Sequence, residues 1–434
     1  MNIDRKIKTI KARQILDCKA RPMLEVDVFT EGGYMGRGSA PTGTSVGMYE
    51  SYIIRDGVPG EYGGMGVHKA ARIVEEEIAP KLAGMDVCDQ KAIDETMLAL
   101  DGTPNKSKLG GNSIYSVSIA CLRAAAAANH MPVYRYLAGE PIKSIPLPTF
   151  NVVNGGRYRH LTQAFNEFII APYLAETVEE AVLIAVSVYQ RLESVITRYL
   201  KGESPTLGGS YGWAAPSDDP AEGYAKAHEV LKLIREAVDE CGYSDKVAYC
   251  LDCASSEMYD KETGTYELRG KRVKADDIIE EVRKLSEEFN LIFVEDILDE
   301  NDWDGFAKAH KILKRTNIIG DDFIVTNVER LKKAYESNSI DGFILKPNQV
   351  GTITEALCTH KFAVDHGMLS IPSGRSGGTV GDIVADLSIG LSSKISKNGA
   401  PKSGERLDKI NSLLRASSEN PGCGICSFDG IIRF

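Results

Sequence analysis

LIFVED, residues 291–296, is a short apolar run that ends in two carboxylates, and the recurrence of this pattern decides the fold. Runs of the same kind lie before and after it: VAYCLD at 247–252, NIIGDD at 317–322 and GFILK at 342–346. The charged ends Glu295, Asp321 and Lys346 are 26 and 25 residues apart, and a further 25 residues lead to Ile371, which ends GMLSI. Strands that alternate with helices at this spacing are typical of a parallel (β/α) barrel, so the sequence predicts an α/β fold.

Four of these predicted strands end in a charged residue: Asp252, Glu295, Asp321 and Lys346. Because the carboxyl ends of barrel strands converge on one mouth, we expect the four side chains to surround one opening. Three carboxylates suit Mg²⁺, and a lysine beside a divalent cation can have its pKa lowered enough to act as a base. The group therefore favours abstraction of a proton next to a carboxylate, with the metal stabilising the enolate.

The chain divides into two predicted domains, an N-terminal α+β domain over residues 1–141 and a barrel domain over 142–434. In the first, residues 21–30 alternate like a strand, 31–33 form a turn, and an extended pattern resumes at 34. Residues 67–82 and 113–128 read as helices, and the alanine content of the second predicts close packing. In the barrel domain, helices are predicted at 178–200, 221–241 and 275–289.

The charge balance excludes some partners. The chain has 51 Lys and Arg against 61 Asp and Glu, a net charge of −10, which argues against nucleic acid or an anionic membrane as a partner. No apolar stretch approaches the ~18 residues of a membrane span, and the N-terminus has no signal peptide, so a cytoplasmic protein is predicted.

Several long motifs resemble the enolase family, in the family's order and over nearly the whole chain. They include APTGTSVGMYE (40–50), NEFIIAP (166–172), LKPNQVGT (345–352), SGRSGG (373–378) and NGAPKSGERLDKINSLLR (398–415). The resemblance implies an enolase-type (β/α)8 TIM-like barrel behind an N-terminal capping domain. It also implies Mg²⁺-dependent dehydration of 2-phosphoglycerate to phosphoenolpyruvate, and a homodimer or larger homo-oligomer.

The resemblance also implies roles for individual residues. Two Mg²⁺ are expected: the first is held by Asp252, Glu295 and Asp321, and the second arrives with the substrate and binds Ser45. Asp322 is interpreted as a hydrogen-bonding neighbour of this site rather than a ligand. Lys346 matches the base, Lys397 the partner of the substrate carboxylate, Arg375 and Ser376 the phosphate-binding pair, and Glu167 a glutamate on the acid side.

The departures from the family pattern lie on the side of the leaving hydroxyl. Tyr211 stands where the family has its catalytic acid glutamate, Tyr158 where a histidine belongs, and Gly374 where a second histidine belongs. A phenol is protonated at neutral pH and can donate, but it is a poor acid for a hydroxide leaving group. Tyr211 is therefore predicted to be a weak catalytic acid and Tyr158 a substrate contact, while Gly374 opens space near C3 of the substrate. Alternatively, the aromatic side chains only refill vacated space.

Three functions follow as hypotheses. The first is a lyase that acts on 2-phosphoglycerate or a close phospho- or phosphono-2-carboxylate, with weak dehydration. The second is an enolase-like enzyme of phosphonate metabolism that resembles the carboxyphosphonoenolpyruvate synthases. The third is a non-catalytic Mg²⁺-binding protein with another role, for which no exchange of the substrate α-proton is expected.

Overall fold

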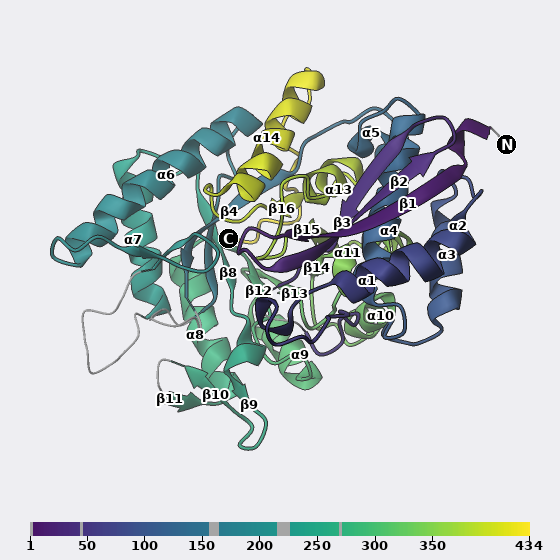
Figure 1. Ribbon diagram of the computed structural model, residues 1–434. Coiled ribbons are helices and arrows are strands. Elements are labelled where there is room, and N and C mark those ends of the chain that lie inside the picture. Colours follow the sequence, from purple (N-terminus) through teal and green to yellow (C-terminus); the bar gives the residue numbers. More distant parts are fainter. Residues whose placement is uncertain (1–2, 44–46, 156–164, 215–225, 269–270) are drawn as a thin grey trace.

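The computed structural model describes residues 3–43, 47–155, 165–214, 226–268 and 271–434. Figure 1 shows a small domain built from the N-terminal third of the chain beside a larger domain built from the rest. None of the helices in the described part is long and apolar enough to cross a membrane.

The N-terminal domain is a three-stranded antiparallel sheet covered by helices. Its strands are β1 (Ile7–Leu16), β2 (Pro22–Thr30) and β3 (Met35–Ser39), in the order β1-β2-β3. Its helices are α1 (His68–Ile73), α2 (Ala79–Leu82), α3 (Gln90–Asp101), α4 (Gly111–Ala128) and α5 (Val133–Ala138), and a π-helical turn, η3 (Val74–Ile78), joins α1 to α2. The predicted strand at 21–30 and both predicted helices are confirmed, whereas β1 was not predicted because its lysines and arginines obscure the alternation.

Close packing of the alanine-rich helix on the sheet is confirmed. Helix α4 lies directly on β3, where Gly36 and Gly38 face it. A Cβ atom at either glycine would overlap the backbone of Ala120 or Ser116, so only glycine admits the helix at this distance.

The larger domain is a closed barrel of eight strands. They are β4 (Leu147–Asn154), β5 (Glu167–Ala171), β8 (Ala248–Asp252), β12 (Leu291–Glu295), β13 (Asn317–Gly320), β14 (Gly342–Leu345), β15 (Leu369–Pro372) and β16 (Ile395–Lys397). The strands pair in this order, β16 pairs with β4, and a bridge from Ser373 to Lys397 joins the β15 end to β16. Apolar side chains from all eight strands fill the interior, among them Cys250, Phe293 and Ile344.

One barrel strand runs opposite to the predicted direction. Strand β5 is antiparallel to both of its neighbours, β4 and β8, whereas the remaining barrel pairs are parallel. Glu167 therefore lies opposite Asp252 at the carboxyl end of β8, although it is the first residue of its own strand. The reversal explains how a residue at the start of a strand reaches the barrel mouth.

Helices surround the barrel and bury the outer faces of its strands. They are α6 (Val178–Tyr199), α7 (Ala227–Glu240), α8 (Ala275–Glu288), α9 (Trp303–Ile312), α10 (Val328–Glu336), α11 (Pro347–Val350), α12 (Ile353–Asp365), α13 (Val384–Gly390) and α14 (Gly404–Glu419). The predicted helices at 178–200 and 275–289 are confirmed; of the helix predicted at 221–241, residues 221–225 lie outside the described part. Short peripheral strands are β6 (Thr206–Leu207), β7 (Trp213–Ala214), β9 (Tyr259–Asp260), β10 (Thr265–Leu268) and β11 (Lys271–Val273).

Candidate active site

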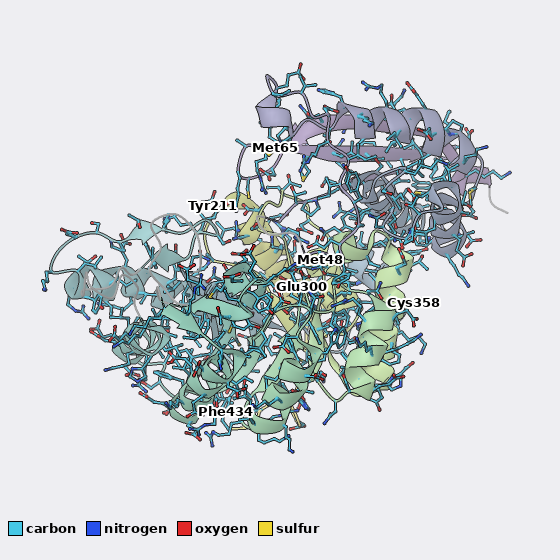
Figure 2. All side chains as sticks on the ribbon, turned by 90° about the horizontal axis from the view of Figure 1, so that it is seen from below. Met48, Met65, Tyr211, Glu300, Cys358 and Phe434 are labelled. Carbon is cyan, nitrogen blue, oxygen red and sulfur yellow. The ribbon has the colours of Figure 1, made fainter. Side chains whose placement is uncertain are left out.

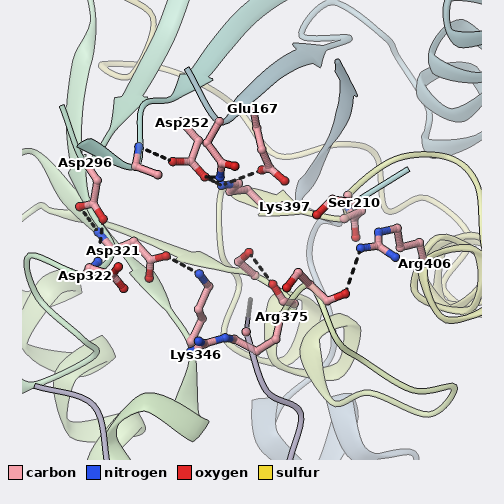
Figure 3. Close-up of a pocket in the computed structure, with 18 of the residues that line it drawn as sticks. Glu167, Ser210, Asp252, Asp296, Asp321, Asp322, Lys346, Arg375, Lys397 and Arg406 are labelled. Atoms are coloured by element: carbon pink, nitrogen blue, oxygen red, sulfur yellow. Dashed lines mark hydrogen bonds and ion pairs between the residues drawn. The ribbon is translucent and has the colours of Figure 1, made fainter. Parts of the chain in front are cut away.

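A cavity opens at the mouth of the barrel, where the predicted site residues meet (Figure 3). It is lined by five acidic and five basic side chains: Glu167, Asp252, Asp296, Asp321, Asp322, Lys346, Arg375, Lys397, Arg406 and Lys409. Small or uncharged residues complete the lining, among them Ser210, Gly374 and Ser376. The strand-end pattern thus brings its charged residues together, as the barrel prediction requires.

Lys397, at the end of β16, lies among three carboxylates. Its Nζ forms an ion pair with Glu295 and lies 3.4 Å from both Asp252 Oδ2 and Glu167 Oε2. Burial lowers the pKa of the Lys397 ammonium, but the surrounding carboxylates outweigh it and the pKa is well above its usual value. Burial also raises the pKa of Asp252 to about 6 and that of Glu295 well above its usual range. One ammonium does not neutralise three carboxylates, two of them buried, so this part of the site favours an additional cation.

The unpaired oxygen of Glu295 fits such a cation. Glu295 is 1% exposed, and its Oε1 has no hydrogen-bond partner among the described residues, although Oε2 contacts Lys397. A buried carboxylate oxygen without a donor is costly unless a cation completes it. Oxygen ligands from Asp252, Glu295 and Asp321 are those that Mg²⁺ prefers, so the residues present fit the expected metal.

Asp321 and Lys346 form a buried ion pair on the other side of the cavity. The Lys346 ammonium contacts Asp321 Oδ2, while Asp321 Oδ1 accepts a hydrogen bond of 2.9 Å from Gln349 Nε2. Burial opposes ionisation of Asp321, but Lys346 outweighs burial and the net pKa is lowered. The Lys346 pKa is raised: burial lowers it, and the Asp321 charge more than compensates. In this arrangement Lys346 is held as an ammonium.

Asp296 holds the Asp321 segment in place, a role that sequence reasoning missed. Its two carboxylate oxygens accept hydrogen bonds of 2.8 Å from the backbone N–H groups of Asp321 and Asp322. Ligand oxygens of these three residues come within 4.8 Å of one another. The sequence did contain a sign of this role. Asp296 is the second acidic residue of LIFVED, and an acidic residue directly after a strand-end ligand can reach the segment that follows the next strand.

Arg375 reaches the cavity from the segment after β15 and is fixed by the N-terminal domain. Its Nη1 donates to Glu50 Oε2 at 2.8 Å, and Glu50 Oε1 accepts from the Gly47 N–H at 3.0 Å. Both side chains of the pair are at most 5% exposed. Ser376 lies beside Arg375 in the cavity lining, so the structure brings the predicted phosphate-binding pair together.

The structure does not bring Tyr211 into the cavity lining. Its hydroxyl lies 3.5 Å from the Cys18 carbonyl oxygen of the N-terminal domain, and Figure 2 shows Tyr211 on the barrel side that faces this domain. The residue has a φ of 64°, its carbonyl accepts a hydrogen bond from the Tyr189 hydroxyl at 2.6 Å, and its neighbour Ser210 lines the cavity instead. This geometry does not support the predicted acid role, because Tyr211 does not line the cavity and its hydroxyl lies beside a backbone carbonyl of the other domain.

Two predicted residues cannot be placed. Ser45, expected to bind the second metal, and Tyr158, expected to contact the substrate, lie outside the described residues. In contrast, two cations that were not predicted, Arg406 and Lys409, line the cavity from α14. Both lie in the motif NGAPKSGERLDKINSLLR (398–415), but charged residues of an amphipathic helix are usually exposed, so the sequence did not indicate a role for them.

Comparisons with known proteins cover both domains. Residues 7–137 match the family "Enolase, N-terminal domain", and residues 142–425 match "Enolase, C-terminal TIM barrel domain". Similar relatives named Enolase come from Methanopyrus kandleri, 39% identical over 96% of both chains, and Corynebacterium kroppenstedtii, 39% identical over 94% of this chain and 93% of its own. Another, from Bifidobacterium longum subsp. infantis, is 38% identical over 95% of this chain and 94% of its own.

Proposed function

Because this chain belongs to the enolase family, we propose that it is a Mg²⁺-dependent carbon–oxygen lyase that removes the α-proton of 2-phosphoglycerate or of a close phospho- or phosphono-2-carboxylate. The observation that carries the proposal is a cavity that is lined by Lys346, Lys397 and Arg375 beside carboxylates that include Asp252 and Asp321. A base, a carboxylate partner and a phosphate partner are therefore available around one substrate-sized opening.

Each residue has a part in the proposed reaction. Lys346 takes the proton from C2, Lys397 pairs with the substrate carboxylate, and Arg375 with Ser376 binds the phosphoryl oxygens, for which a guanidinium fork is well shaped. Glu167 lies beside Lys397 on the acid side. Two Mg²⁺, the first held by Asp252, Glu295 and Asp321, would supply positive charge that stabilises the enolate. A further positive charge beside Asp321 also lowers the pKa of Lys346 toward that of a base.

We propose that dehydration of 2-phosphoglycerate itself is weak. General acid catalysis contributes roughly 10²–10⁴-fold to a rate. The position of the family's acid carries Tyr211, whose hydroxyl points at Cys18 O. Proton abstraction does not need this acid, so abstraction is expected to continue while loss of the hydroxide is slow.

The glycine at position 374, where the family has a histidine, favours a second candidate. An enolase-like enzyme of phosphonate metabolism would keep the proton-abstracting half of the site and accept a different group at C3. This alternative is supported by Lys409 of α14, which lies against Gly374 and lines the cavity with it, although the structure fills with Lys409 the space that was expected at Gly374.

Exchange of the substrate α-proton with solvent deuterium tests the proposal. With Mg²⁺ and 2-phosphoglycerate in D2O, we expect the C2 proton signal to disappear in NMR spectra, and Lys346→Ala to slow this at least a hundredfold. Lys361→Ala, which changes an exposed lysine paired with Asp365, is the control. Absence of exchange across phospho- and phosphono-carboxylates would favour the non-catalytic Mg²⁺-binding protein. Conversion to phosphoenolpyruvate at the rate of an ordinary family member would contradict the weak dehydration.

Three further expectations stay predictions. They are the homodimer or larger homo-oligomer, which sedimentation velocity checks, the domain boundary at residues 141–142, and the cytoplasmic location.

A further inference from the structure

The side of the cavity away from the strand-end carboxylates carries two buried cations from α14. Arg406 and Lys409 are 4% and 3% exposed, and both line the cavity. Figure 3 shows Arg406 across the cavity from Asp296, Asp321 and Asp322, with Arg375 between them. Arg406 is therefore separate from these carboxylates, and the proposed reaction assigns no role to Arg406 or Lys409.

Lys409 lacks a counter-charge among the described residues. Its Nζ donates a hydrogen bond of 3.0 Å to the carbonyl oxygen of Glu405, one turn earlier in its helix. Within the described part of the chain, no carboxylate oxygen lies within 4.0 Å of this nitrogen. Burial lowers the pKa of Lys409, and the more distant Asp382 opposes this effect only in part. A buried ammonium in this situation is stabilised by an anion that binds beside it.

Gly374 lies directly against Lys409, and both residues line the cavity. A Cβ atom at this position would lie 3.3 Å from Lys409 Nζ and 3.7 Å from Asp382 Oδ2. Asp382 Oδ2 is buried and has no hydrogen-bond partner among the described residues. A side chain at position 374 would press on the ammonium, so glycine leaves Lys409 uncovered on the side of the cavity.

Arg406, the other cation of α14, lies beside the predicted phosphate site. Its guanidinium forms an ion pair with Glu405, and its Nη2 lies 3.5 Å from the carbonyl oxygen of Ser376. Because Arg406 already has a carboxylate partner, Lys409 is the stronger candidate for a ligand anion.

We propose that Lys409 forms a second anion-binding subsite, and that the substrate of this protein carries a second acidic group, a carboxylate or a phosphoryl group, on C3. The acidic group would accept a hydrogen bond from the Lys409 ammonium. This inference rests on the proposed function and deepens it, since it names the substrate class: phospho-2-carboxylates that are larger and more negatively charged than 2-phosphoglycerate.

Binding of matched ligands in the presence of Mg²⁺ tests the subsite. The probes are 2-phosphotartrate, which is 2-phosphoglycerate with a carboxylate on C3, its counterpart with a phosphono group on C3, and the neutral counterpart with a methyl group, 2-phospho-2,3-dihydroxybutanoate. A charge-assisted hydrogen bond is worth about tenfold to a hundredfold in affinity. We therefore expect at least one acidic probe to bind at least tenfold more tightly than the methyl probe in calorimetry, and which one does so identifies the acidic group.

Substitutions test whether Lys409 causes the tighter binding of the acidic probe. Lys409→Met keeps the length of the side chain and should abolish the preference for the acidic probe, whereas Lys409→Arg should retain most of it. Where Lys409→Met fails to fold, Gly374→Ala is the second variant: the added methyl should weaken both kinds of C3-substituted probe more than 2-phosphoglycerate.

The outcomes separate this inference from the proposed function. Equal affinities for acidic and methyl probes, or a preference that survives in Lys409→Met, would overturn the subsite even if α-proton exchange of 2-phosphoglycerate is observed. Failure of every probe to bind, together with absence of exchange, would overturn both. A loss of stability in Lys409→Met with an unchanged preference would mean that the lysine is only structural.

Discussion

Lowering the pH from 8 to 5 should weaken Mg²⁺ binding through the buried carboxylates at the barrel mouth. Burial raises the pKa of Asp252 to about 6, so its carboxylate is ionised at pH 8 and mostly protonated at pH 5. A metal ligand must be deprotonated, and a bound proton therefore competes with the metal. We therefore expect the Mg²⁺ affinity to fall as the pH falls through about 6.

The magnitude follows from the fraction of ionised Asp252. With a pKa of about 6, about one molecule in ten carries the carboxylate at pH 5, which corresponds to about a tenfold loss of affinity relative to pH 8. Glu295, whose pKa is also raised by burial, adds a second proton and steepens the dependence. Without metal, the raised pKa of Asp252 also makes the free energy of unfolding depend on pH. The stabilisation by protonated Asp252 is fully present below its unfolded pKa of 3.8 and is lost as the pH rises through about 6.

Isothermal titration calorimetry with Mg²⁺ between pH 5 and 8 measures the effect, and buffers of different ionisation enthalpy count the released protons. Asp252→Asn should weaken binding and flatten the pH dependence. Asp260→Asn, at a partly exposed aspartate of β9, is the matched control and should follow the wild type. An affinity that stays constant from pH 5 to 7, or no proton release, would refute the reasoning.

Two other predictions concern residues near the cavity. Tyr211→Phe removes a hydroxyl that lies 3.5 Å from Cys18 O, so the slow conversion of 2-phosphoglycerate to phosphoenolpyruvate should stay within about twofold, and a hundredfold loss of this conversion would restore the predicted acid role. Gly399→Ala should lower the free energy of unfolding in urea by about 2–3 kcal/mol, because the residue has a φ of 76° and a Cβ would lie 2.7 Å from Arg406 Nε. Gly242→Ala, with a φ of 75° and open space around it, should cost only about 1 kcal/mol, and equal losses would exclude the steric contribution.

The strand-end part of the site was predictable because apolar runs end where the barrel interior ends. Glu295 ends β12 and Asp252 ends β8, as the pattern indicates, and Lys346 follows β14 directly. The direction of β5 was not predictable, because a buried strand has the same apolar sequence pattern whether its neighbours are parallel or antiparallel to it. The orientation of Tyr211 depends on a left-handed backbone and a contact with the other domain, which no local pattern encodes.

Lys409 was missed for a different reason. On α14 it lies among charged residues, and a helix pattern shows which face is apolar but not which lysine is buried by a distant segment. Its environment depends on Gly374, which lies 35 positions earlier in the chain. Pairs of this kind become visible only when the fold brings them together.

The reversed direction of strand β5 also determines how many helices connect it to the next barrel strand. Strand β5 ends, and strand β8 begins, at the end of the barrel opposite to the mouth. Two helices connect these strands: α6 runs toward the mouth and α7 runs back. The turn between these helices returns to the mouth, where the Gly212 N–H donates to Asn154 Oδ1 at 2.8 Å. The connection from β4 to β5 and that from α6 to α7 therefore join elements whose described ends lie at the mouth, and no predicted metal ligand belongs to either connection. The Tyr158 and Tyr211 departures from the family pattern belong to these two connections, so both changes lie outside the strands that carry the predicted metal ligands.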